Sequence, residues 1–69
     1  MSVAKIIEIS SMSTKSFEDA IQNGLKRAES SLKNVKGAWI AEQKVDYANG
    51  QITHYRVIMR VTFVLDKDD

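Results

Sequence analysis

The 69-residue chain has no cysteine, no proline and a single histidine, His54. Without cysteine it can form no disulfide, no thiolate metal site and no cysteine nucleophile. One histidine cannot form a cluster, and no nucleophile is visibly paired with His54, so we expect it to be a surface strand residue. No carboxylate pair or nucleophile–base spacing stands out, and the acidic tail LDKDD lacks the spacing of a calcium loop. The sequence therefore predicts neither an enzyme nor a metal site.

Long hydrophobic runs and strong charge are also missing. No stretch approaches the roughly 18 apolar residues of a membrane span. The N-terminal MSVAKIIEISS has too short an apolar run, and no basic lead-in, for a signal peptide. A net charge of +1 argues against a dedicated nucleic-acid binder. We expect a cytoplasmic protein with no membrane or nucleic-acid partner.

What is present is the composition of one small globular domain, residues 1–69. Hydrophobic residues make up 43% of the chain and charged residues 28%. A domain this small buries only about 60% of the surface that its unfolded chain exposes, so it usually needs extra stabilisation. Since a disulfide and a metal are excluded, we expect a homo-oligomer.

The N-terminal half predicts a strand followed by a helix. Residues 3–9 are short, β-branched and roughly alternating, which is typical of a strand, and a loop is expected over 10–14. Ser16 is a good N-cap for a helix over about 17–34, and Gly37 suits the C′ position. The helix has one apolar stripe, formed by Phe17, Ile21, Leu25, Ala28 and Leu32.

The C-terminal half predicts a β-hairpin. Strands are expected over about 38–48 and from 51 to about 65, joined by Asn49-Gly50, which favours a type I′ turn. The order is then β-α-β-β. The most economical arrangement is an α+β fold, with a three-stranded antiparallel sheet in strand order 1-3-2 and the helix on one face.

The expected register places Trp39, the single tryptophan, on the sheet face away from the helix. A two-residue turn without a bulge pairs Trp39 with Arg60, Ala41 with Ile58, Gln43 with Arg56, and Val45 with His54. Tyr47 is expected on that face as well. Together these side chains look like a subunit interface or a platform for a planar ligand, and the pattern alone favours the interface.

Three stretches carry a resemblance to a known family: VAKIIEIS, SFEDAIQNGLKRAESSLKNVKGAW and ITHYRVIMRVTFVL. Their order, spacing and total length resemble those of the dodecins over nearly the whole chain. The resemblance implies a hollow homododecamer with helices outward and sheets toward the interior. It also implies flavin (riboflavin, FMN or FAD) held in pairs on two-fold axes, each ring stacked on a tryptophan and hydrogen-bonded by a glutamine of the last strand.

The tryptophan of the family carries over to Trp39, but the position of the glutamine holds Arg56, and the hairpin is slightly shorter. Arginine lacks the acceptor of an amide, although it can donate to ring carbonyls or stack on a ring. The candidate ligand-binding residues are Trp39, Arg56 and Gln43. The alternatives without a ligand are packing of Trp39 across a subunit axis, and an ion pair of Arg56 with Glu42 or with an acidic residue of a neighbouring subunit.

Two functions remain open at this point. The first is a small-molecule binding protein that stores or sequesters flavin. The second is a structural or interaction shell of the same architecture that binds no flavin, with Trp39 as interface packing. Coenzyme A, metal ions and other planar ligands stay open as alternatives to flavin.

Overall fold

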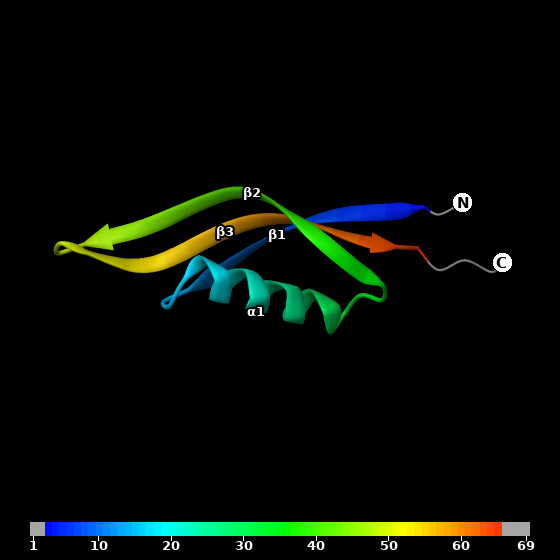
Figure 1. The fold of residues 1–69 in the computed structure, drawn as a ribbon, viewed down its shortest axis with the longest axis horizontal. Helices are drawn as coiled ribbons and strands as arrows, with labels where there is room; N and C mark the ends of the chain where they lie inside the picture. The colour runs from blue at the N-terminus through cyan, green and yellow to red at the C-terminus, as the bar shows by residue number, and fades with distance from the viewer. Residues whose placement is uncertain (1–2, 66–69) are drawn as a thin grey trace.

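The computed structural model describes residues 3–65, which form four elements (Figure 1). These are β1 (Ala4–Ser13), α1 (Phe17–Glu29), β2 (Val35–Ala48) and β3 (Gln51–Val64). The strands form one antiparallel sheet in the order β1-β3-β2, and α1 lies along one face of it. The predicted fold class, element order and strand order are confirmed.

Strand β1 is longer than predicted, because residues 10–13 continue the strand instead of forming a loop. They pair with β3 as far as Ser13, which lies opposite Tyr55. The polar side chains that suggested a loop are bonded to the helix: the Ser11 hydroxyl donates to the Ala20 carbonyl at 2.7 Å, and the Ser13 hydroxyl donates to the Asp19 carboxylate at 2.7 Å. The serines of residues 10–13 are typical of a loop by sequence, but those on the helix-facing side of this edge strand form hydrogen bonds between β1 and α1.

Helix α1 begins as predicted and ends earlier. The Ser16 side chain accepts a hydrogen bond from the Asp19 backbone at 2.9 Å, which confirms the N-cap. The helix stops at Glu29 rather than near residue 34, and the Ser30 hydroxyl bonds back to the Arg27 carbonyl. The chain then reverses at Asn34, whose φ is 61°, so asparagine rather than Gly37 takes the left-handed position. Gly37 lies inside β2.

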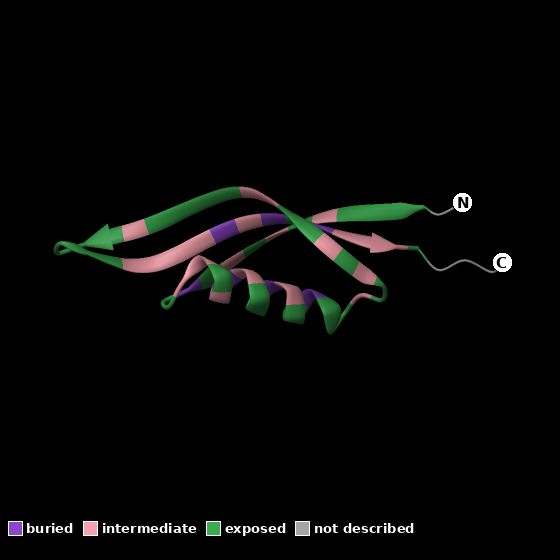
Figure 2. Ribbon diagram, in the orientation of Figure 1, coloured by how far each residue is buried: buried purple, intermediate pink, exposed green. Residues whose placement is uncertain are grey.

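The core lies between α1 and the odd-numbered side chains of β3. Figure 2 marks the buried positions on both elements. Strand alternation sends those side chains toward the helix and the even-numbered ones to the opposite side. The buried core residues are Ala20, Ala28, Val57, Met59 and Val61, and the partly buried residues packed against them are Ile7, Ile9, Phe17, Ile21, Leu25, Leu32, Val35 and Ile40. All five members of the predicted helix stripe belong to this set.

The β2–β3 hairpin extends well past the start of α1 and makes the molecule long and thin (Figure 1), with extents of 56 × 19 × 13 Å. Its turn is Asn49-Gly50, with φ of 54° and 78°. Positive φ at both central residues is the signature of a type I′ turn, as predicted. The outer part of this hairpin projects beyond the helix, so its helix-side face is left uncovered within residues 3–65.

Candidate ligand-binding face

The sheet face away from α1, called the open face below, carries Trp39. Trp39 lies opposite Arg60 in the register of β2 and β3, as predicted, and is 63% exposed. The Arg60 guanidinium lies 4.8 Å from the centroid of the indole ring, within range of a cation–π interaction. Arg60 also reaches the Glu8 carboxylate of β1 at 3.6 Å. The indole is thus held by the neighbouring strand on one ring face while most of its surface stays accessible.

The predicted pairing of Gln43 with Arg56 is wrong. Lys44 lies opposite Arg56, and Gln43 lies opposite Val57, a buried residue of the helix-side face. Strand alternation therefore directs Gln43 away from Arg56 and Trp39. The structure brings Trp39 and Arg56 to one face, and it does not bring Gln43 there.

Two bulges cause this difference. One extra residue in β3, Thr53, shifts the pairing just after the turn, and one extra residue in β2, Ala41, shifts it back before Trp39. Between the bulges every β2 side chain lies on the opposite face from the one expected. Three predicted pairings fail for this reason (Ala41–Ile58, Gln43–Arg56 and Val45–His54), and the observed ones are Glu42–Ile58, Lys44–Arg56 and Asp46–His54.

The same shift moves two apolar residues off the open face. Val45 pairs with Tyr55, whose side chain lies on the helix side, and Tyr47 lies two residues farther along β2 on the same face as Val45. The side chains of Val45 and Tyr47 therefore lie on the helix side, beyond the helix. Tyr47 is 69% exposed there, and Val45 and Ile52 are exposed as well. The expectation that Val45 and Tyr47 lie beside Trp39 is wrong.

Asp46 is a neighbour of Arg56 that the sequence analysis did not single out. Its carboxylate accepts from Arg56 Nε at 3.0 and 3.1 Å and lies 2.9 Å from Arg56 Nη2. The hydrogen bond from Arg56 lowers the pKa of Asp46 below its ordinary value of 3.8, and Asp46 raises the pKa of Arg56. His54 Nδ1 lies 3.7 Å from the same carboxylate. Within the described chain Arg56 pairs with Asp46 and not with Glu42, which the sequence analysis offered as the alternative to a ligand contact. The sequence gives no sign of this pair until the bulge at Thr53 is known.

A small hollow of about 150 Å³ lies beside Arg56 on the open face. Its lining consists of Arg56, Ile58, Lys44, Glu42 and Ser10. Lys44, Arg56 and Glu42 are the charged side chains of its lining, and Asp46 outside the lining pairs with Arg56. The rim of the hollow therefore offers both donors and acceptors without a strong net charge.

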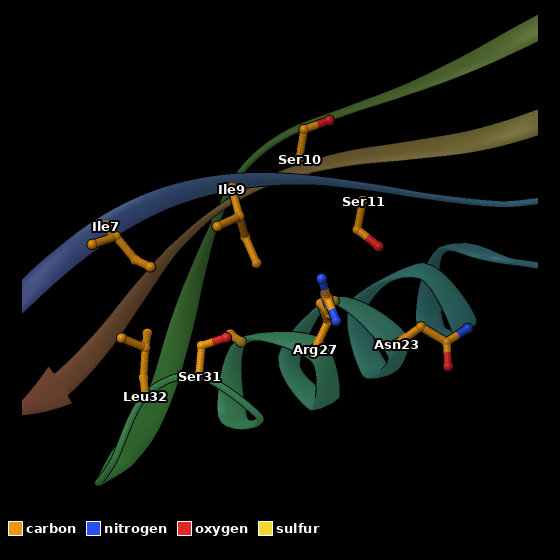
Figure 3. Close-up of a pocket in the computed structure, with 10 residues that line it drawn as sticks. Ile7, Ile9, Ser10, Ser11, Asn23, Arg27, Ser31 and Leu32 are labelled. Atoms are coloured by element: carbon orange, nitrogen blue, oxygen red, sulfur yellow. The ribbon is translucent and has the colours of Figure 1, made fainter.

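A larger groove of about 450 Å³ lies on the other side of the sheet, between β1 and α1 (Figure 3). Ile7, Ile9 and Leu32 supply apolar walls, and Arg27 points into the space from the helix. This groove does not touch Trp39 or Arg56. It leaves apolar surface uncovered next to β1, an edge strand.

Neither a metal-binding cluster nor a membrane-spanning helix is found among the described residues. Between residues 3 and 65 no three His, Cys, Asp or Glu side chains gather closely enough to hold a metal ion. Across the same stretch no helix has the length and hydropathy needed to span a bilayer. Residues 66–69 of the acidic tail, for which no metal site was predicted, lie outside the described residues.

Comparisons with known proteins place the chain in a family. The dodecin family model matches residues 3–66. A dodecin from Streptomyces davaonensis is 32% identical, with a TM-score of 0.89 and coverage of 96% of this chain and 97% of that one. An arginine-to-alanine mutant of the Thermus thermophilus dodecin is 27% identical, with a TM-score of 0.90 and coverage of 97% and 100%.

A third solved structure, the calcium-chelating antigen calcium dodecin of Mycobacterium tuberculosis, carries a calcium-binding site. It is 29% identical, with a TM-score of 0.79 and coverage of 97% of this chain and 96% of that one. A search of curated proteins gives no significant match. Because the family model spans nearly the whole chain and the solved dodecins share its fold, the chain belongs to the dodecin family.

Proposed function

We propose that this dodecin assembles into a hollow homododecamer that binds flavin on its open face and stores it in the cytoplasm. The role is binding rather than turnover, because a ring sandwiched between tryptophans is shielded from a second substrate. The proposal rests on family membership together with the geometry of the open face. One observation carries it: an exposed tryptophan held on a sheet rather than on a loop.

The exposure of Trp39 is the argument for a stacking site. A tryptophan side chain has a large apolar surface, and 63% exposure is unusual for it. Exposed aromatic residues with apolar or cationic neighbours are typical of interaction sites. Its backbone is paired with the central strand β3, and Arg60 covers one face of the ring at 4.8 Å. The indole is therefore pre-positioned, and a flavin that stacks on the remaining face pays little ordering entropy.

The amount of apolar surface that one described chain leaves uncovered supports assembly. The groove between β1 and α1 and the projecting end of the hairpin both expose apolar side chains on the helix side of the sheet. Ile6, Met12 and Trp39 add exposed apolar surface on the open face. A small domain with apolar surface on both faces is stabilised by association with further copies.

The test is titration of riboflavin and FMN fluorescence against the wild-type protein, Trp39→Ala and Trp39→Phe, with sedimentation run in parallel. We expect quenching by the wild type, at least tenfold weaker binding by Trp39→Ala, and binding by Trp39→Phe close to that of the wild type, because phenylalanine keeps a stacking ring. All three should sediment as the same large oligomer. Absence of quenching at tens of micromolar wild-type protein would reject flavin storage.

A shell that binds no flavin is the second candidate, and the contact of Arg60 with Trp39 favours it. In that case the guanidinium and the indole form a structural pair that packs across a subunit boundary. The same experiment then gives the reverse pattern: the wild type quenches neither flavin, and Trp39→Ala shifts the sedimentation coefficient toward smaller species.

A further inference from the structure

The Asp46–Arg56 pair keeps unused hydrogen-bonding capacity on the open face. Arg56 has five N–H groups, and Asp46 engages Nε and one hydrogen of Nη2. Three N–H groups of Arg56 and a lone pair of Asp46 Oδ1 are left. The side chains of Arg56 and Asp46 are 43% and 30% exposed, so these groups are accessible to a ligand.

The pair therefore presents unused N–H donors of Arg56 next to Asp46 Oδ1, a carboxylate oxygen that among the described residues accepts only from Arg56 Nε. We infer that Asp46 and Arg56 together read the imide edge of a ring ligand, Asp46 accepting the ring N–H and Arg56 donating to the adjacent ring carbonyl. The inference rests on the proposed flavin function and makes Asp46 its specificity-determining residue. A carboxylate alone would repel the carbonyls beside the ring N–H, and a guanidinium alone has no acceptor for that proton.

The position of the pair suits a fused ring that stacks on Trp39. Arg56 lies four positions before Arg60 on the same face of β3, which corresponds to about 13 Å at roughly 3.3 Å per residue. Ile58 lies between them and lines the hollow beside Arg56. A three-ring ligand that covers the indole and runs along β3 thus has an apolar floor and brings one ring edge to Arg56.

The charges around the pair argue against an anion site. Asp46 neutralises Arg56, and Glu42 lines the same hollow as Lys44. Selectivity should therefore depend on the ring N–H and little on a phosphate elsewhere in the ligand. A hydrogen bond to a charged acceptor distinguishes a ligand that has the donor from one that lacks it by about tenfold or more.

The experiment compares lumiflavin with 3-methyllumiflavin, which stacks equally well but has no N–H at that edge. We expect the assembled wild-type protein to bind lumiflavin at least about tenfold more tightly. Asp46→Ala should bring the ratio of the two dissociation constants close to one. The control Glu42→Ala removes a carboxylate of the hollow beside Arg56 that forms no ion pair with Arg56 among the described residues, and should keep the wild-type ratio. Asp46→Ala combined with Arg56→Gln should restore the preference, because one amide supplies donor and acceptor.

The outcomes separate the inference from the function. If wild type binds both flavins equally, and Trp39→Ala weakens both, the proposed function stands and the reading of the imide edge is overturned. The reading is also overturned if Asp46→Ala keeps the wild-type ratio. If wild type binds neither flavin, the flavin function and the inference fail together. The wild-type comparison needs no variant, so misfolding of Asp46→Ala does not remove the test.

Discussion

Replacing Gly24 with alanine tests how tightly α1 packs on the sheet. Gly24 is a buried residue in the middle of the helix. A Cβ placed there would lie 2.5 Å from Met59 Cε, 3.0 Å from Ser11 Cβ and 3.1 Å from Ser11 Oγ. Contacts this short require Met59, Ser11 or the helix to move.

Two effects of opposite sign decide the result. Alanine favours the helix over glycine by about 1 kcal/mol. Overpacking of a filled core costs about 1–3 kcal/mol. The methionine end is flexible, but Met59 is fully buried, and Ser11 is held by its 2.7 Å hydrogen bond to Ala20. We therefore expect the overpacking to win and Gly24→Ala to lower the free energy of unfolding by about 1 kcal/mol net.

The assay is thermal or urea unfolding at one fixed protein concentration, because the apparent stability of an oligomer depends on concentration. Gly37→Ala is the matched control, since a Cβ there meets nothing within 4 Å. Adding Met59→Val to Gly24→Ala should cost less than the sum of the two single changes, because the smaller side chain relieves the contact. A melting temperature of Gly24→Ala above that of the wild type would refute the reasoning.

Three further predictions concern the hairpin, the helix cap and the ion pair. Gly50→Val should cost about 1 kcal/mol or more in unfolding experiments, because φ is 78° there; an unchanged melting curve would contradict the type I′ turn. Ser16→Ala should cost about 1 kcal/mol, and Ser16→Gly only a few tenths, through loss of the N-cap bond to Asp19. Because Arg56 lowers the folded-state pKa of Asp46, the pair stabilises the protein above the ordinary value of 3.8 and this stabilisation is lost as pH falls through the lower folded-state value. Acid titration of unfolding should show a smaller loss for Asp46→Asn over that window; equal losses would mean that the pair adds nothing.

Local sequence signals predicted the elements well where one residue type has a strong conformational preference. Ser16 specified the helix start, and Asn49-Gly50 specified the turn, because each acts through its own backbone neighbourhood. Signals failed where a residue's partner is remote in the sequence. Ser11 and Ser13 were predicted to be loop residues because their hydrogen-bond acceptors, which lie in α1, cannot be identified from the sequence.

The candidate site divides in the same way. The opposition of Trp39 and Arg60 was predicted, although for an incomplete reason: two bulges of opposite sense cancel before that point. The segment between the bulges was predicted on the wrong face, so Gln43 was chosen as a site residue and Asp46 was overlooked. A single extra residue in one strand moves the following side chains of that strand to the opposite face of the sheet. Neither Thr53 nor Ala41 is a residue type that predicts a bulge.

The sequence by itself determined the α+β class, the strand order, the tight hairpin and the placement of an exposed tryptophan away from the helix. These follow from hydrophobic periodicity and from two or three residues with strong local preferences. Only the tertiary structure decided which side chains accompany Arg56. That choice depends on the hydrogen-bond register between β2 and β3, where the bulges set which carboxylate meets the guanidinium, in the part of the hairpin that projects past the start of α1.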